Sequence, residues 1–429
     1  MDAHEKLSLF AEQMALEPAE EADAGARRPK RIPLDVPVRA GGSAANGAGK
    51  APPLPCGLDR PPSAPAGGSR RDQPGTQGSS PLPIYHAAVS GGRTLPMLKT
   101  LLTSACERNC YYCPFRAGRN YRRVTFKPEE MAKTFAEMQR AGLVEGLFLS
   151  SGIIKGGVAT QDRILETAEI LRHRIGFRGY LHLKIMPGAE RAQVERAMAL
   201  ADRISVNLEA PNTRRLQRLA PIKQFTEELL QPLRWAEEIR RTRPAREGWN
   251  GRWPSTVTQF VVGAAGESDL ELLQTAEYLY NRLHLRRTYF SAFRPITGTP
   301  LEEQPAESAW REHRLYQAGF LLRDYDFTME EMPFDGEGRL PLDVDPKLGW
   351  ARAHLAEAPV EVNRASREEL LRLPGVGVKG AEAILRARRR GRLRELDDLR
   401  RVGVVTTRLA PFVLLDGAQP ARQLSLFGW

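Results

Sequence analysis

Between Leu98 and Arg323, short β-rich runs alternate with longer amphipathic stretches. The β-rich runs cover residues 98–104, 146–150, 180–185, 203–208, 256–262 and 287–293. Helical patterns of apolar residues separate them, as in residues 128–139, 161–174 and 268–283. Strands that alternate with helices in this order form parallel sheets that the helices cover. The sequence therefore predicts an α/β fold, a partial (βα)6 TIM barrel over residues 83–330.

Three cysteines, Cys106, Cys110 and Cys113, follow the first predicted strand in a C-x3-C-x2-C pattern. Ligand sites of parallel α/β folds lie at the carboxyl ends of the strands, so the thiols stand where the fold places chemistry. Three thiolates leave one iron of a [4Fe-4S] cluster without a protein ligand, and an open iron can bind a substrate. The pattern predicts such a cluster with these three cysteines as its ligands.

A zinc site is the first alternative for the cysteines. It needs a fourth ligand in tetrahedral geometry, for which Cys56, His86 and His182 are the candidates. Cys56 falls in a stretch rich in Pro and Gly, which makes it a poor ligand. Chance clustering at a buried strand end is the second alternative, and the polar residues 107–109 argue against it.

The cysteine motif resembles that of radical S-adenosylmethionine (SAM) enzymes. The resemblance implies that the open iron chelates SAM, and that reduction by an external electron donor cleaves SAM to methionine and a 5′-deoxyadenosyl radical. It also implies that an aromatic residue before the third cysteine, a Gly-containing segment after the second strand and polar residues after the fourth bind SAM. The matching positions are Tyr112, Ser150, Ser151, Gly152, Asn207 and Glu209. Ordinary packing of Tyr112 and a solvated Glu209 are the alternatives.

Two further groups lie at predicted strands. Gln259 and the turn at residues 263–267 belong to the fifth strand and its end, and they suit a loop that faces adenine. His182 and Lys184 alternate along the third strand and share one face, either toward the barrel lumen or in a structural or surface role. No catalytic residue is singled out.

Residues 359–416 predict a small all-α helix-hairpin-helix domain, joined to the barrel by a connector at 331–358. Its helices are expected at 366–373, 379–390, 396–401 and 407–414. Gly375 and Gly377 allow a tight turn that aims backbone N–H groups at a phosphate, and Lys379 adds charge. The DNA-binding residues predicted are Gly375, Gly377, Lys379, Arg388, Arg389 and Arg390. A protein-interaction hairpin with a solvated basic face is the alternative.

The charge of the whole chain and its last residues each indicate a partner. A formal net charge of +11 favours polyanions such as nucleic acid. The tail at 417–429 carries a pentapeptide that resembles the motif for binding the bacterial sliding clamp, with Gln423, Leu424, Leu426 and Phe427 as its contact residues. Apolar anchors of this kind dominate the affinity of an extended peptide.

The remaining segments bound the cellular setting. Residues 1–16 have a helical pattern, and residues 17–82 are rich in Pro, Gly, Ala and Ser, which predicts a disordered linker. Only four cysteines occur, so a secreted disulfide framework is excluded and a reducing cytoplasm is expected. No apolar run approaches the roughly 20 residues that span a bilayer, so no membrane partner is expected.

Taken with the motifs above, several stretches resemble the DNA modification/repair radical SAM family. They are residues 101–106, residues 145–152, residues 182–184 with 187–189, residues 311–318, and residues 359–363 leading into 373–377. The resemblance implies SAM, one [4Fe-4S] cluster, a nucleic-acid-related role and a uracil-DNA-glycosylase-like partner protein. The chain departs from the family near its start, where a segment rich in Cys and Ser is expected and Cys56 alone occurs.

The function expected from these features is DNA modification or repair by a radical SAM enzyme. A radical SAM enzyme that acts on RNA or a small metabolite is one alternative, and a non-catalytic DNA-binding iron–sulfur scaffold is another.

Overall fold

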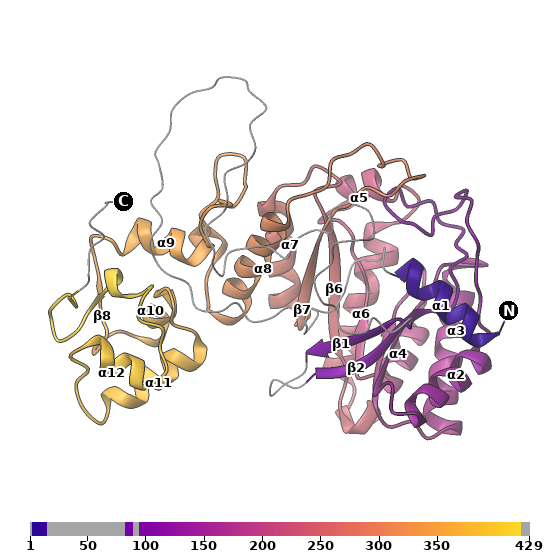
Figure 1. Ribbon diagram of the computed structural model, residues 1–429, viewed down its shortest axis with the longest axis horizontal. Coiled ribbons are helices and arrows are strands. Elements are labelled where there is room, and N and C mark those ends of the chain that lie inside the picture. The colour runs from indigo at the N-terminus through magenta and orange to yellow at the C-terminus, as the bar shows by residue number, and fades with distance from the viewer. Residues whose placement is uncertain (1, 15–81, 89–93, 422–429) are drawn as a thin grey trace, which may run out of the picture. The chain divides into compact units, whose positions relative to one another are not determined.

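The computed structural model describes residues 2–14, 82–88 and 94–421. These form two compact units, the first ending at Ser308 and the second beginning at Ala309 (Figure 1). Cys56, nearly all of the predicted linker at 17–82 and the predicted clamp-binding residues Gln423, Leu424, Leu426 and Phe427 lie outside the described residues.

The first unit is built on a seven-stranded sheet in the order β1-β2-β3-β4-β5-β6-β7. The strands are β1 (Ile84–Ala88), β2 (Thr94–Leu101), β3 (Gly146–Ser150), β4 (Tyr180–Lys184), β5 (Arg203–Ser205), β6 (Ser255–Val262) and β7 (Arg287–Ala292). From β2 onward all pairs are parallel, as between Leu98 and Leu147, so the predicted α/β partial barrel is confirmed.

Three details of the sheet differ from the prediction. The edge strand β1 pairs antiparallel with β2 and was not expected, because its five residues have no clear apolar alternation. The first predicted strand begins earlier and ends at Leu101 rather than at residue 104, and the fourth ends at Ser205 rather than at residue 208. Residues 102–104 instead begin the loop that carries the three cysteines. In this loop the Thr103 hydroxyl donates to Val124 O at 3.1 Å.

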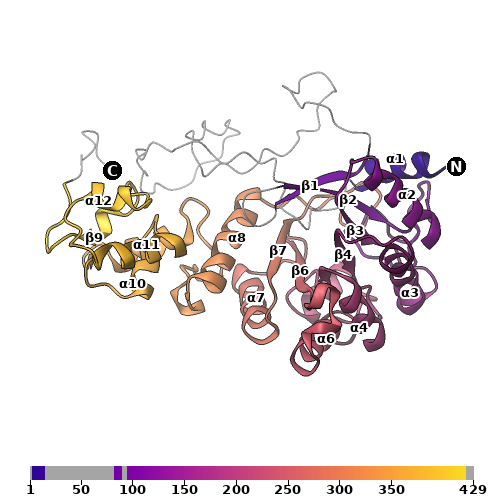
Figure 2. The ribbon, with the colours of Figure 1, turned by 90° about the horizontal axis from the view of Figure 1, so that it is seen from below.

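Helices follow the strands. The helices between β2 and β7 are α2 (Pro128–Arg140), α3 (Gly156–Glu169), η1 (Ile170–Arg174), α4 (Arg191–Leu200), α5 (Thr213–Leu219), η2 (Phe225–Leu230), α6 (Gln231–Thr242), η3 (Ala245–Glu247), η4 (Trp249–Gly251) and α7 (Asp269–Leu283). The long helices α2, α3, α4, α6 and α7 lie on one side of the curved sheet (Figure 2). In α2, Met131, Phe135 and Met138 recur at helical spacing and are buried. Strand β3 is buried throughout, as expected of a parallel strand covered on both faces.

The amino-terminal helix α1 (Ala3–Met14) packs on the end of the cysteine loop. Leu7 and Phe10 are fully buried, and the Phe10 ring stacks on Phe126 at 5.8 Å between centroids. Lys6 pairs with Glu130 of α2. Two such apolar side chains contribute roughly 1.5–3 kcal/mol each, which fastens this helix to the barrel.

The second unit contains α8 (Ala309–Asp324), η5 (Met329–Glu331), α9 (Pro346–His354), β8 (Val360–Glu361), α10 (Arg367–Arg372), α11 (Val378–Arg388), α12 (Leu396–Arg401), η6 (Ala410–Phe412) and β9 (Val413–Leu414). The helix predicted at 407–414 is wrong, because this segment forms turns, η6 and β9, which pairs parallel with β8. Pro411 and the β-branched Val413 disfavour an α-helix there. Among the described residues, no helix combines the length and apolarity needed to cross a bilayer.

Candidate functional site

The cysteine loop, defined as residues 102–127, leaves the carboxyl end of β2. Its three cysteines are free thiols; Cys110 is buried, while Cys106 and Cys113 are half-buried. The backbone N–H of Ile153 lies 3.4 Å from Cys106 Sγ, and that of Phe115 lies 3.4 Å from Cys113 Sγ. These donors favour the thiolate forms that an iron cluster requires.

Arg123 holds the cysteine loop together from within. Its Nη1 donates to Ser104 O and to Phe115 O, both at 2.7 Å. Its Nη2 donates to Arg116 O at 2.8 Å and to Arg119 O at 3.2 Å. One guanidinium thus bonds backbone on both sides of the three cysteines and closes the loop around them.

The end of α5 and the segment after it contact the same loop from outside. Tyr111 N, between the second and third cysteines, donates to Leu219 O at 2.7 Å. Arg108, between the first and second cysteines, pairs with Glu228 of η2 at 2.6 Å, and both side chains are largely buried. Neither contact was expected from the sequence, because the partners lie more than a hundred residues apart.

A buried ion pair lies beside Cys110. Lys223 Nζ lies 3.0 Å from Glu209 Oε1, and their side chains are 9% and 7% exposed. Burial alone would lower the pKa of Lys223, but the negative charges of a Cys110 thiolate and of the Glu209 carboxylate raise it above its usual value, so the lysine is charged. Burial also raises the pKa of Cys110, and the Lys223 charge opposes that rise. Lys223 was missed by sequence reasoning because no motif contains it.

Tyr112 and Glu209, predicted separately as SAM-binding residues, are brought together. Burial raises the pKa of Tyr112 well above its usual value, and the Glu209 carboxylate adds to this through its charge and a hydrogen bond. Glu209 lies shortly after the end of β5, where it forms a bridge with Phe260 of β6. Its backbone is left-handed, with φ 65°. The solvated Glu209 considered as an alternative is wrong, because the residue is 5% exposed.

The segment after β3 contacts the cysteine loop directly. Gly152 N donates to Thr103 O at 2.7 Å, and a Cβ at Gly152 would lie 2.2 Å from Ala105 O. Glycine is therefore required here by the approach of the cysteine loop. Ser150 and Ser151 are buried beside it, with the Ser151 hydroxyl donating to Gly152 O.

Of the other predicted positions, Asn207 stands out. Its Oδ1 is buried and has no hydrogen-bond partner among the described residues, which leaves an acceptor for a ligand. His182 is fully buried against Phe148, with ring centroids 4.4 Å apart, so a surface role for it is excluded. Gln259 is buried on β6, and the turn after that strand is held by Glu267, which accepts from Gly263 N and Ala265 N.

The donor set consists of three free thiols from one loop. Three thiolates can hold a cubane with one iron left open. Within the part of the chain that the structure describes, no group of three His, Cys, Asp or Glu side chains is arranged to hold a single metal ion. The N–H donors at two sulfurs and the charged Lys223 offset the negative charge that a cluster brings.

The second unit shows the geometry of the predicted hairpin. Gly375 has φ 85°, and a Cβ there would lie 2.6 Å from Val405 O. Gly377 is the N-cap of α11, and Lys379 lies exposed in its first turn. Arg388, predicted to bind DNA, donates instead to Ala365 O at 2.6 Å and Val362 O at 3.3 Å.

Four cations on α11 and directly after it are exposed, and the structure gives their side chains no ion pair among the described residues: Lys379, Arg386, Arg389 and Arg390. Lys379 and Arg386 are two turns apart on one face of α11, and Arg389 and Arg390 follow its carboxyl end, so we call these four residues the cation stripe. By contrast, Arg392 pairs with Asp416 at 2.7 Å and Arg401 with Asp398 at 3.0 Å.

Residues 100–279 match the model of the radical SAM superfamily, and residues 360–387 match the helix-hairpin-helix motif. A parallel half-barrel with a three-cysteine loop at its strand ends is the arrangement of that superfamily. The chain therefore carries a radical SAM domain and a helix-hairpin-helix motif, and it is an enzyme that uses a [4Fe-4S] cluster and SAM. No curated protein sequence matches the chain.

Solved structures with a similar fold include methylornithine synthase (TM-score 0.42, 16% identity), which covers 53% of this chain. The FeFe-hydrogenase maturase HydG from Carboxydothermus hydrogenoformans has a TM-score of 0.42 at 16% identity over 53% of the chain. Coproporphyrinogen III oxidase from Escherichia coli has a TM-score of 0.35 at 17% identity over 61%. The chain covers 61%, 51% and 59% of those proteins, respectively.

Proposed function

We propose that this radical SAM enzyme acts on nucleic acid, with DNA as the expected substrate, in DNA modification or repair. One observation carries the proposal: the chain joins a three-cysteine loop at the mouth of a half-barrel to a helix-hairpin-helix unit with a stripe of exposed cations. Contacts from such a hairpin to phosphates read the backbone and not the base sequence.

Cys106, Cys110 and Cys113 would hold the cluster, and SAM would bind beside them to Tyr112, Ser150, Ser151, Gly152, Asn207 and Glu209. The unsatisfied Asn207 Oδ1 would accept a hydrogen bond from a hydroxyl or ammonium group of SAM. When bound, the reduced cluster and SAM supply a radical that abstracts hydrogen from the substrate. The protein's part is to place the substrate and to exclude water.

In the second unit, the backbone N–H groups at the start of α11 and the side chain of Lys379 would contact a phosphate. Arg386, Arg389 and Arg390 would extend that contact along the polyanion. Gly375 and Gly377 serve the turn itself, and Arg388 serves the domain more than the ligand.

Anaerobic reconstitution followed by assay of 5′-deoxyadenosine tests the proposal, with duplex DNA, single-stranded DNA, RNA and no nucleic acid in parallel. Stimulation by DNA above the other conditions is expected. Stimulation by RNA alone would move the substrate to RNA, equal turnover in all four would favour a small metabolite, and no SAM cleavage at all would favour the scaffold.

Binding is tested separately with Lys379→Glu/Arg386→Glu. We expect weaker duplex binding for all sequences alike and a salt slope lower by about 0.9 for each lost phosphate contact. The matched control is Lys379→Glu/Arg401→Glu, since Arg401 is already paired with Asp398. Equal loss in both doubles would show that Arg386 contributes no more than a charge elsewhere on the unit, and it would limit the phosphate contact to Lys379.

Three partners belong to the same proposal: an external electron donor, a uracil-DNA-glycosylase-like protein and a bacterial sliding clamp. The clamp would bind Gln423, Leu424, Leu426 and Phe427. Replacement of Leu426 and Phe427 by Ala should lower clamp affinity at least roughly tenfold, because each buried anchor contributes roughly 1.5–3 kcal/mol. Cluster content should stay unchanged, and a titration with no difference between wild type and variant would remove the clamp from the proposal.

A further inference from the structure

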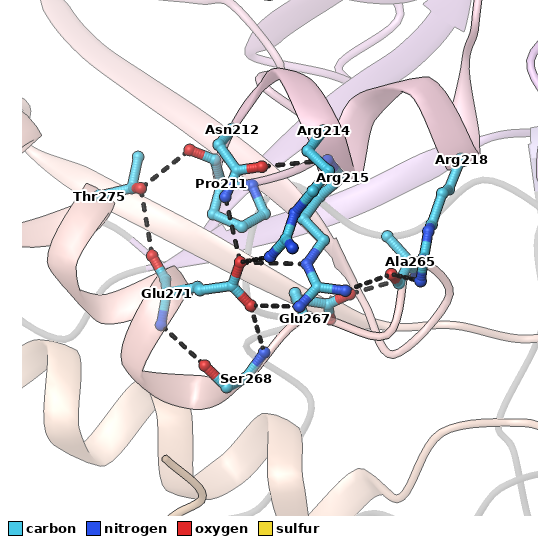
Figure 3. Close-up of polar contacts among 10 residues, drawn as sticks. All are labelled: Pro211, Asn212, Arg214, Arg215, Arg218, Ala265, Glu267, Ser268, Glu271 and Thr275. Carbon is cyan, nitrogen blue, oxygen red and sulfur yellow. Dashed lines mark hydrogen bonds and ion pairs between the residues drawn. The ribbon is translucent and has the colours of Figure 1, made fainter. Parts of the chain in front are cut away.

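Three arginines gather on the short helix α5, next to the turn that follows β6 (Figure 3). Arg215 pairs with Glu271 through two bonds, Nε to Oε1 at 3.0 Å and Nη2 to Oε2 at 2.7 Å. Asn212 Nδ2 and Ser268 N also donate to the same carboxylate, at 3.2 and 2.9 Å. Glu271 and Arg215 thus satisfy each other and serve the architecture of this corner.

The two flanking arginines, Arg214 and Arg218, make fewer hydrogen bonds than Arg215. Arg214 is 73% exposed at its side chain, and its one contact is the outer edge of Glu271 at 3.3 Å. Arg218 is exposed, and one of its nitrogens donates to Ala265 O at 3.2 Å. A guanidinium has five donors, so most donors of both side chains face solvent.

The two carboxylates of this corner are already engaged. Glu271 pairs with Arg215, which holds the pKa of that carboxyl at about 2, and it also contacts Arg214 at 3.3 Å. Glu267 is fully buried and accepts from backbone N–H groups of the turn. Three guanidinium groups thus face two carboxylates, and Arg214 and Arg218, one helical turn apart, keep most of their donors toward solvent.

The pair stands beside the cysteine loop. Helix α5 follows the carboxyl end of β5, and the turn at 263–267 follows that of β6, so both lie on the edge of the sheet where the cysteines lie. The next residue after Arg218 is Leu219, whose carbonyl accepts from Tyr111 N inside the cysteine loop. Helix α5 thus connects these arginines directly to the backbone of the cysteine loop.

We propose that Arg214 and Arg218 bind phosphates of the nucleic-acid segment that enters the barrel, as a second contact independent of the helix-hairpin-helix unit. Planar guanidinium groups match phosphate oxygens through paired hydrogen bonds, and a polymer with regularly spaced phosphates engages both. This inference rests on the proposed function and deepens it. The hairpin unit recruits the polymer, and the arginine pair positions one strand for the chemistry.

The test uses the full chain with its hairpin contact weakened by Lys379→Glu/Arg386→Glu. In that background, binding of a fluorescent single-stranded DNA oligonucleotide is followed by anisotropy across a salt series, with and without Arg214→Gln/Arg218→Gln. We expect at least a tenfold loss of the remaining affinity and a salt slope lower by about 1.4, which corresponds to two phosphates on a single strand. Arg214→Lys/Arg218→Lys should recover the salt slope, since the charge is restored, but only part of the affinity, since an ammonium group cannot make the paired hydrogen bonds.

The matched control is Arg196→Gln/Arg243→Gln, on exposed arginines that already pair with Glu169 and Glu195. Iron content and melting temperature confirm that each variant is folded. The inference is overturned if Arg214→Gln/Arg218→Gln leaves the residual binding unchanged, or if the control lowers it equally. In that case DNA binding by the wild type still supports the proposed function. A wild type that binds no nucleic acid overturns both.

Discussion

Loss of the Arg123 side chain should release the cluster without unfolding the barrel. Its guanidinium bonds four carbonyl oxygens, those of Ser104, Phe115, Arg116 and Arg119. A hydrogen bond to a charged group contributes roughly 1.5–3 kcal/mol, but water can replace part of this at a half-buried loop. A net loss of roughly 3 kcal/mol for Arg123→Met is therefore expected, which is about a hundredfold in the population of the ordered loop.

The measurement is iron and sulfide per chain after anaerobic reconstitution, together with the rate at which a chelator removes iron. Arg123→Met should retain little cluster and lose it at least tenfold faster, and Arg123→Lys should fall between it and the wild type, because one ammonium cannot reach both sides of the loop. Arg140→Met is the control, since Arg140 donates only to Ala136 O of its own helix, at 3.3 Å. Wild-type iron retention in Arg123→Met, with the same melting temperature, would refute the role assigned to Arg123.

Three further outcomes follow from the structure. Cys110→Ala should abolish cluster incorporation and SAM cleavage, and near-stoichiometric iron with its visible absorption would contradict the assignment. Burial lowers the pKa of Lys347 to about 7, although the Asp345 carboxylate opposes this shift. Above that pH the unfolded chain binds more protons than the folded chain at this lysine. The free energy of unfolding should therefore rise between about pH 7 and 10. Lys347→Met should remove that rise. If wild type and variant show the same pH dependence in urea unfolding, Lys347 is not its cause. The pKa of Glu271, lowered to about 2 by Arg215, predicts stability that is fully present above its usual pKa and is lost as pH falls from about 4.5 to 2. Glu271→Gln should lack this loss, which acid unfolding curves would show.

The glycine at position 152 illustrates how far sequence reasoning reached into the site. A Gly-containing segment after the second strand was expected beside the cysteines, and it is found there. The sequence suggested that this glycine is needed for binding SAM. In the structure, the closest neighbour of Gly152 is the cysteine-loop backbone at Ala105. A motif identifies which residue is needed but not which atoms approach it.

What the sequence alone determined was the order of strands and helices, the place of the three cysteines and the hairpin turn. These depend on periodicity and on spacing within one short segment, which local interactions set. Only the tertiary structure paired Lys223 with Glu209, Arg108 with Glu228 and Arg123 with the two halves of its loop. It also decided which arginines are engaged, as Arg388 and Arg215 are, and which remain exposed, as Arg390 and Arg218 do. The physical reason is that a charged side chain donates hydrogen bonds to the acceptors that the fold brings within about 3 Å. Acceptors that are distant in the chain leave no pattern in the local sequence.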